Sequence, residues 1–453
     1  MMNKFNFNYI QLIILHIAVG VAIFAFGALS KVYFSLVIVV FLYRIINAAK
    51  KDRATEVLMA CSYIVGCEVF LRMTGGNFSY EASKYSVILF LVVGIFYNSV
   101  SRKSYPYLIY ILLLVPGIVL ASVTLNYETV FRKAVAFNIS GPICLGIAAL
   151  YCYNRKIPVK HLDRITQAIV LPIIANATYL YLYNPSIKDV LSGTQSNFEA
   201  SGGFGPNQVA TVLGLGIFAL VVRYIMFSKT LLIKILNLVL LALIAYRGII
   251  TFSRGGIFTA VLCILAFLVI YFMNSNSKRK TEVIRSIVVI ALLSVGIWIY
   301  SSVQTLGFID KRYANQDAAG RVKEDVTTGR VELLTSEFQE FFNNPFFGVG
   351  VGKIKEVRLE SIGVNAASHN EMSRILAEHG VFGVVAFLIL LLTPLILRSR
   401  NKKNYLFYSF YLFWFLTINH SSMRIAAPAF IYGLCLLDIQ YDKPVVHRKQ
   451  VSK

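Results

Sequence analysis

The stretch Gly256–Met273, GIFTAVLCILAFLVIYFM, carries no charged residue over 18 positions. Roughly 17–25 predominantly apolar residues cross the hydrocarbon core of a bilayer as a helix. Three further runs, Ile10–Ala28, Tyr85–Val100 and Tyr105–Val123, have the same uncharged character. Because the bilayer core offers no water to exposed backbone groups, we interpret these runs as membrane-spanning helices.

The composition of the whole chain agrees with this interpretation. Of its 453 residues, 57% are hydrophobic and only 15% are charged, and the mean hydropathy is +0.66. Soluble domains are typically about 25% charged and about 45–50% apolar. The alternating pattern of an outer-membrane barrel is absent. The sequence therefore predicts an all-α polytopic membrane protein.

The formal net charge of +22 is concentrated in short breaks between the apolar runs. Examples are the clusters at residues 50–53, 102–103, 155–164, 278–280 and 398–403. Short basic loops mark the cytoplasmic side of a membrane protein. No basic stripe with interleaved aromatic residues lies outside the membrane, which argues against nucleic-acid binding.

Placing these basic loops inside gives about 12–14 transmembrane helices and two cytoplasmic termini. The fourteen expected spans are 10–28, 32–48, 55–73, 85–100, 105–122, 138–153, 163–183, 207–227, 231–250, 256–273, 283–301, 372–397, 405–419 and 425–440. We expect the first to be an uncleaved helix and not a signal peptide. The chain thus divides into an N-terminal helix bundle (1–301), a large external loop (302–371), and C-terminal helices with a basic cytoplasmic tail (372–453).

The external loop holds ten of the 22 acidic residues. Within it, Val331, Leu334, Phe338, Phe341 and Phe342 recur at helical spacing, which predicts an amphipathic helix that ends at the following Asn-Asn-Pro. Such a helix either lies along the membrane surface or packs on neighbouring helices. The six cysteines lie in or beside apolar runs and form no CxxC pair, so we interpret them as packing residues.

Arginines near the outer boundary are the first candidates for chemistry, because topology does not explain them. Arg254 precedes a predicted helix start, where its guanidinium and free backbone N–H groups could face one anion. The planar guanidinium fork suits phosphate oxygens. Arg330 opens the amphipathic helix in the same way, and Arg321, after Gly320, is a weaker candidate of this type. The alternatives are an interfacial, snorkelling Arg254 and ordinary solvated arginines at the other two positions.

Other candidates lie close to the same boundary. His369, just before a predicted span, is suited to accept a proton near neutral pH; the alternative is a capping or buried histidine. We expect the glycine-rich loop 184–206, with the adjoining Asn207, either to line a cavity or to form a simple turn. The run NPFFGVGVGK at 344–353 fails the P-loop test, since Phe347 replaces the first glycine and Ile354 replaces Ser or Thr. We interpret it as a turn packed against the membrane surface. No His, Cys and Asp cluster has metal-ligand spacing.

An ordered set of short motifs resembles the O-antigen ligase and polymerase superfamily of bacterial membrane proteins. The set comprises Ser253-Arg254-Gly255-Gly256, Gly329-Arg330, Asn344-Pro345-Phe346-Phe347-Gly348-Val349-Gly350, His369-Asn370, and Glu378-His379-Gly380-Val381-Phe382-Gly383. The resemblance covers roughly residues 200–400. The N-terminal half agrees only as generic membrane helices.

This resemblance implies a GT-C-like, metal-independent, inverting glycosyltransferase of the bacterial inner membrane that needs no cofactor. The donor would be a glycan on undecaprenyl pyrophosphate, at an active site facing the periplasm or exterior. Arg254 and Arg330 would hold the pyrophosphate and stabilise its developing charge, and His369 would orient or deprotonate the acceptor hydroxyl. Arg321, Asn207 and Asn370 are further expected substrate-binding residues.

The acceptor separates the possible activities. A polymerase of surface polysaccharide (O-antigen or capsule) passes the growing chain to another lipid-linked repeat unit. This is the activity that we predict. A ligase passes it to lipid A–core or to a protein. A transporter or flippase for lipid-linked sugars is a third class, and Glu68 is the clearest intramembrane acid that it could use. Membrane lipid and a chain-length regulator are further expected partners.

Overall fold

A computed structural model describes residues 8–191, 193–323, 329–363, 365–400 and 404–441 of the chain. The basic tail at 442–453 therefore lies outside the described part. The helices of the first half are α1 (Tyr9–Ala25), α2 (Leu29–Asn47), α3 (Lys50–Met73), α4 (Ala82–Asn98), α5 (Tyr105–Leu113), α6 (Val115–Thr124), α7 (Phe131–Cys152) and α8 (Val159–Tyr183). Those of the second half are α9 (Pro206–Met226), α10 (Leu231–Ile249), α11 (Arg254–Met273), α12 (Ser277–Gln304), α13 (Phe308–Tyr313), α14 (Arg330–Asn343), α15 (Lys353–Ile362), α16 (Glu371–Arg400), α17 (Phe407–Ser421) and α18 (Ala426–Cys435).

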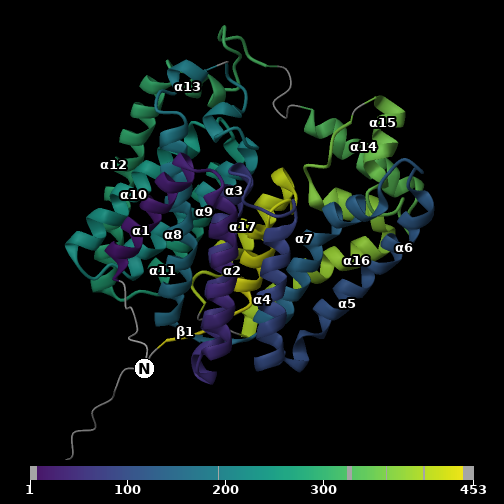
Figure 1. Ribbon diagram of the computed structural model, residues 1–453, viewed down its shortest axis with the longest axis horizontal. Coiled ribbons are helices and arrows are strands. Elements are labelled where there is room, and N and C mark those ends of the chain that lie inside the picture. Colours follow the sequence, from purple (N-terminus) through teal and green to yellow (C-terminus); the bar gives the residue numbers. More distant parts are fainter. Residues whose placement is uncertain (1–7, 192, 324–328, 364, 401–403, 442–453) are drawn as a thin grey trace, which may run out of the picture.

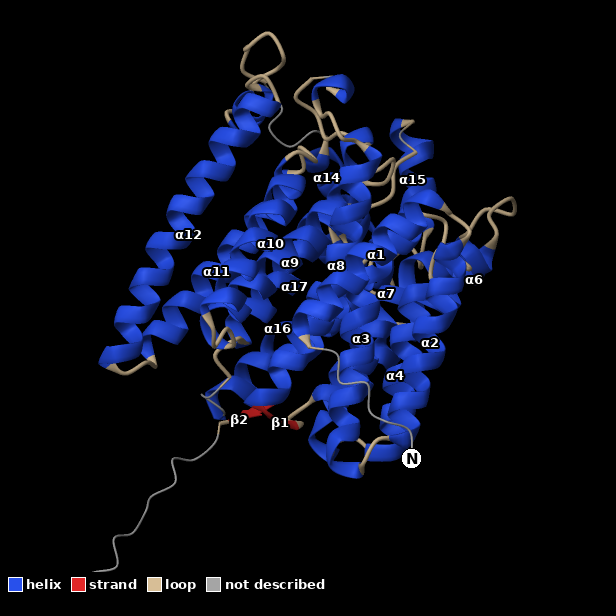
Figure 2. Ribbon diagram, turned by 60° about the vertical axis from the view of Figure 1, so that its left-hand side comes forward, coloured by secondary structure: helices blue, strands red, loops and turns tan. Residues whose placement is uncertain are grey.

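Short elements complete the chain: 3₁₀ turns at Arg102–Ser104, Lys188–Val190 and Glu199–Ser201, and strands β1 (Lys156–Pro158) and β2 (Asp438–Gln440). The two strands pair in parallel, with Ile157 opposite Ile439. They join the basic segment between α7 and α8 to the segment that follows α18, at the lower end of the molecule in Figures 1 and 2.

The prediction of an all-α polytopic membrane protein is confirmed. Among the described residues, ten helices are long and apolar enough to cross a membrane, and α1, α4 and α18 are shorter apolar helices. The span expected at 105–122 is divided into α5 and α6, because Pro116 near the start of α6 cannot supply a backbone N–H. All six cysteines are buried and free.

Burial separates the helices at the centre of the bundle from those at its rim. In the most apolar part of α9, 89% of the residues are buried, against 6% in α12. Helix α12 stands apart from the bundle in Figure 2, and its exposed side chains include Leu292, Val295 and Ile299. Exposed apolar side chains over a whole span are expected where lipid replaces water as the surrounding solvent.

The basic breaks and the described helices of segment 302–371 lie at opposite ends of the bundle. Helix α3 begins at Lys50, and α12 begins among Lys278, Arg279 and Lys280, at the same end as the two strands (Figure 2). Helices α13, α14 and α15 lie at the other end (Figure 1). The amphipathic helix expected from the sequence is α14, and it begins at Arg330, as expected.

Helix α16 is broken at Gly380, which has φ 59° and ψ −137°, a conformation essentially restricted to glycine. The glycine-rich run expected to form a turn supplies hydrogen bonds at this break. Val349 N donates to Ala377 O at 2.9 Å, Gly350 N donates to Glu378 O at 3.1 Å, and Val381 N donates to Pro345 O at 2.8 Å. The run therefore packs on α16, while Phe346 and Phe347 remain exposed beside it.

Candidate functional site

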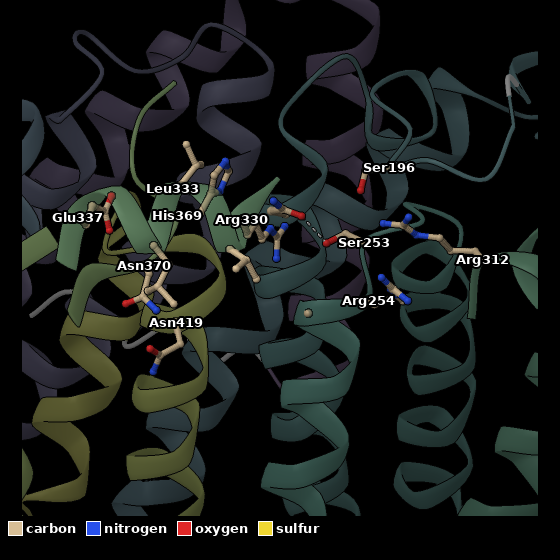
Figure 3. A pocket seen from close by; sticks show the side chains of 14 residues that line it. Ser196, Ser253, Arg254, Arg312, Arg330, Leu333, Glu337, His369, Asn370 and Asn419 are labelled. Atoms are coloured by element: carbon tan, nitrogen blue, oxygen red, sulfur yellow. Dashed lines mark hydrogen bonds between the residues drawn. The ribbon is translucent and has the colours of Figure 1, made fainter. Parts of the chain in front are cut away.

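A cavity of about 250 Å³ opens at the end of the bundle that carries α13, α14 and α15. Its wall is contributed by α9, α11, α13, α14, α17 and the segment before α16. The lining residues are Ser196, Asn207, Ser253, Arg254, Gly255, Arg312, Arg330, Val331, Leu333, Leu334, Glu337, His369, Asn370 and Asn419. We call it the cationic cavity, because three arginines line it. Figure 3 shows Arg254 and Arg312 on one side, His369, Asn370 and Asn419 on the other, and Arg330 between them.

Arg254 is the first residue of α11 and follows a tight turn whose conformation is fixed by packing and a hydrogen bond. Phe252 is buried and has a positive φ of 58°, which is rare for a bulky residue. Ser253 Oγ donates to Asn207 Oδ1 at 2.7 Å, and this bond joins the turn to the start of α9. A Cβ on Gly256 would clash with the backbone at Ala210, and one on Gly255 would lie 2.5 Å from His420. The two glycines therefore let α11 start close against α9 and α17, which holds Arg254 at the cavity.

Arg312, on the short helix α13, is a cavity residue that no sequence pattern indicated. Its side chain is largely buried, and Nε donates to Phe252 O at 3.0 Å. It forms no ion pair with any described residue. Burial, together with the charges of Arg254 and Arg330, lowers the pKa of Arg312. The cationic form is therefore destabilised until an anion enters.

Arg330 occupies the first position of α14, after Gly329, which adopts the left-handed conformation with φ 76°. Burial and the nearby Arg254 lower the pKa of Arg330. Within the described part of the chain it too has no ion pair. The N-terminus of α14 adds positive potential at the same place. The cavity is thus built to receive a negatively charged group.

The carboxylate of Glu337 lines the cavity, but neighbouring groups already satisfy it. Arg358 on α15 donates to it at 2.6 Å, and the hydroxyls of Ser368 and Ser373 donate as well. The Arg358–Glu337 pair is almost completely buried. Together these contacts of Glu337 fix α14 against α15 and α16, so the carboxylate is already paired with groups other than the three cavity arginines.

The backbone carbonyls of the segment that carries His369 accept hydrogen bonds from three other residues. Arg424 donates to Ser368 O at 2.7 Å, Arg358 donates to Ala366 O at 2.6 Å, and Ser422 N donates to His369 O at 3.1 Å. Among the described residues, the buried Nδ1 of His369 has no hydrogen-bond partner. Burial and the nearby cations, first Arg424 and then Arg330, lower the pKa of His369 to about 4. The imidazole is therefore neutral, and able to accept a proton, at neutral pH.

Five of the six expected site residues line this cavity: Arg254, Arg330, His369, Asn207 and Asn370. Asn370 also caps α16, since its Oδ1 accepts from Met372 N at 2.9 Å and Ser373 N at 3.2 Å. Arg321 does not line it. The Arg321 side chain is 82% exposed and pairs with Asp317 at 2.8 Å, so its expected substrate-binding role has no support from the geometry. Within the described ranges, no group of three or more His, Cys, Asp or Glu residues is placed to hold a metal ion.

The fold and the site define a multi-pass membrane protein with a cationic cavity at one end of its membrane-spanning helices. Residues 238–388 match the family described as O-antigen ligase, which confirms the resemblance to the O-antigen ligase and polymerase superfamily. The matched range contains Arg254, Arg312, Arg330 and His369. It supports a ligase- or polymerase-type, glycosyltransferase-like function in general, with lipid-linked glycans as substrates. No curated protein matches the chain.

Proposed function

We propose that the protein polymerises oligosaccharide repeat units, taking the growing glycan from undecaprenyl pyrophosphate and passing it to another lipid-linked unit. The observation that carries this proposal is the meeting of three arginines and one neutral histidine around one cavity. A diphosphate bears several negative charges that match these guanidinium groups. The cavity lies at the end opposite the basic breaks, so by the positive-inside rule it faces the periplasm or exterior.

The reaction is a single displacement at the anomeric carbon. The acceptor oxygen forms a bond to this carbon while the bond from the carbon to the diphosphate oxygen breaks, which inverts the anomeric centre. The electron pair leaves with the diphosphate, whose developing charge Arg254, Arg312 and Arg330 stabilise. The proton of the acceptor hydroxyl passes to a ring nitrogen of His369. The leaving group supplies the driving force, without nucleotide or metal.

An apolar groove provides a place for the lipid part of the donor. It has a volume of about 280 Å³, lies between α9, α10, α11 and α12, and reaches Trp298 and Tyr313. Tyr313 follows Arg312 in the chain, so the groove ends beside the cationic cavity. A polyprenyl tail lying in this groove would bring its diphosphate to the three arginines.

Two other activities use lipid-linked glycans. A ligase would use the same donor chemistry and differ in its acceptor, lipid A–core or a protein, and the matched family does not distinguish it from a polymerase. A proton-coupled carrier would need a free intramembrane acid. Glu68, the candidate for that role, is paired with Arg72 at 2.5 Å and accepts a hydrogen bond from Ala426 N at 2.6 Å, which favours the transferases.

Reconstitution distinguishes the three activities. Purified protein in vesicles with lipid-linked repeat units and no nucleotide should lengthen the glycans. Transfer that requires added lipid A–core would indicate a ligase, and movement across the bilayer without new glycosidic bonds would indicate a carrier.

We expect Arg254→Ala, Arg330→Ala and His369→Ala each to abolish transfer, because each removes a group that contacts the reacting diphosphate or hydroxyl. Arg254→Lys should also be impaired, since a point charge replaces a two-pronged donor. Glycan length on gels measures the loss, and membrane fractionation checks that each variant is inserted. Near-normal glycan length in all three alanine variants would overturn the site assignment.

A further inference from the structure

A larger cavity, of about 550 Å³, lies between the start of α7, helix α15 and the segment before His369. We call it the α7–α15 cavity. Its lining residues are Thr129, Val130, Lys133, Ala134, Phe137, Asn138, Gly352, Ile354, Lys355, Glu356, Leu359, Asn365, Ala367, Ser368 and Glu378. The chemistry proposed above does not use it.

The wall of the α7–α15 cavity differs in character from that of the cationic cavity. No arginine lines it among the described residues, and its two carboxylates are already engaged. Glu356 accepts from Lys353 at 2.9 Å and from the Thr129 hydroxyl. Glu378 accepts from Arg374 at 2.5 Å and from Gly352 N at 2.9 Å. These pairings engage both carboxylates, so the cations that line the cavity are the two exposed lysines, Lys133 and Lys355.

The remaining groups suit a sugar. Asn138 and Asn365 present amides, and the ring of Phe137 and the side chains of Ile354 and Leu359 present apolar surface. Pyranose rings have hydroxyl groups at their edges and C–H groups on their faces. A few polar groups on a mainly apolar wall is also the usual composition of a small-molecule site.

The two cavities meet at one short stretch of backbone. Ser368 lines the α7–α15 cavity, and the next residue, His369, lines the cationic cavity. Consecutive Cα atoms are about 3.8 Å apart. The hydrogen bonds from Arg424 to Ala367 O at 3.1 Å and to Ser368 O at 2.7 Å hold this stretch in place. A glycan in the larger cavity would thus lie directly behind the residue that carries the imidazole.

We propose that the α7–α15 cavity binds inner sugar residues of the acceptor glycan, from which the terminal sugar extends past the Ser368–His369 segment and brings its hydroxyl to His369. This inference rests on the proposed transferase function and adds the position of its second substrate. Donor diphosphate and acceptor sugar would then occupy separate cavities on either side of the Ser368–His369 segment. An acceptor held in this way has its hydroxyl oriented before the donor reacts.

The test uses two neighbouring basic residues at the start of α7. Lys133 and Arg132 are both exposed, but only Lys133 lines the cavity. Lys133→Trp should fill the cavity, and Arg132→Trp is the matched control for the lost charge and added bulk. Asn138→Ala is a conservative second variant that removes one amide, and thermal unfolding in detergent verifies that all three fold.

The probe is the lipid-free oligosaccharide released from lipid-linked repeat units, which lacks a leaving group and serves only as an acceptor. Its binding to the full-length protein in nanodiscs is measured by calorimetry, and its KM as an acceptor is measured in the transfer assay. We expect Lys133→Trp and Asn138→Ala to weaken binding and to raise this KM at least about tenfold. The KM for the lipid-linked donor should not change, and Arg132→Trp should resemble wild type in both assays.

The outcomes separate this inference from the proposed function. If wild type lengthens glycans and both cavity variants keep the wild-type acceptor KM, the cavity assignment is wrong and the transferase proposal stands. If wild type makes no glycosidic bond but binds the oligosaccharide in a Lys133→Trp-sensitive way, the sugar site stands and the transferase proposal fails. If Lys133→Trp impairs binding of undecaprenyl phosphate and leaves oligosaccharide binding intact, the cavity holds lipid, and our inference is overturned.

Discussion

At the scale of single residues, the positive charge around His369 controls when the imidazole can act as a base. Burial and the guanidinium groups of Arg424, Arg330 and Arg358 lower the pKa of His369 to about 4 in the substrate-free protein. A group with this pKa is neutral at pH 7 but is a weak base. A bound diphosphate would offset the positive charges, stabilise the imidazolium and raise the pKa. Donor binding would therefore turn His369 into a stronger base.

This argument predicts different pH profiles for kcat/KM and kcat. The active form of His369 is neutral, so activity falls as the pH drops below the governing pKa. The acid limb of kcat/KM for the donor, which reports the free protein, should lie near pH 4. The limb of kcat should lie at higher pH, because the bound diphosphate favours the protonated ring. Initial rates of glycan transfer across this pH range measure both limbs; coincident limbs would contradict the prediction.

Arg312 and Arg321 form a matched pair for testing the cationic cavity. Arg312 is buried in the cavity wall, whereas Arg321 is exposed and paired with Asp317. Arg312→Ala removes a charge that faces the leaving group and should lower the transfer rate by about 10²–10³-fold, as for the loss of one preorganised donor. Arg321→Ala should leave the rate unchanged. Equal effects of the two substitutions would show that general surface charge, and not the cavity, determines activity.

At the scale of structural elements, the glycine-rich run at 344–352 has a specific structural task. The break in α16 at Gly380 exposes the carbonyls of Ala377 and Glu378, and the run supplies the N–H groups that satisfy them. A Cβ on Gly348 would lie 2.5 Å from the backbone at Glu378 and His379. The break lies in the helix that Asn370 caps, so the run supports the site through α16.

This role predicts that Gly348→Ala is poorly tolerated. Gly348 and Gly363 both have positive φ, 71° and 69°, but a Cβ on Gly363 would meet no atom of the described residues within 4 Å. Gly363→Ala should cost about 1–2 kcal/mol, the strain of the left-handed conformation alone. Gly348→Ala adds overlap with backbone that cannot move aside, and should cost several kcal/mol more than the control. Thermal unfolding of the purified variants compares them, and similar midpoints would refute the task assigned to the run.

At the scale of the whole molecule, the elements were more predictable than the contacts between them. The apolar runs predicted the helices because the bilayer requires long uncharged segments. Arg254 and Arg330 were recognisable because each opens a helix next to glycine. Arg312 lies on a six-residue helix without a comparable signal, and Arg321 resembled Arg330 locally, although Asp317 lies four residues before it and pairs with it.

The positioning of His369 could not be predicted from local patterns at all. Arg424 donates to Ser368 O, 56 positions away, and Arg358 pairs with Glu337 across 21 positions. Neither Arg424 nor Arg358 lies in a local sequence pattern that would indicate these contacts. Contacts of this kind depend on how the helices pack, and short-range sequence patterns do not specify that packing.

The orientation of the chain in the membrane predicts which introduced cysteines can be labelled from outside. Because all six native cysteines are buried, wild-type protein should react little with a membrane-impermeant maleimide. Val322 is 73% exposed in the external loop, so Val322→Cys should be labelled on intact cells or spheroplasts. Lys278→Cys, in the exposed basic first turn of α12, should be labelled only after permeabilisation, because the positive-inside rule places this end of α12 in the cytoplasm. The reverse pattern would place the cationic cavity in the cytoplasm, where a donor displayed on the outer face could not reach it, and the proposed transfer would then be excluded.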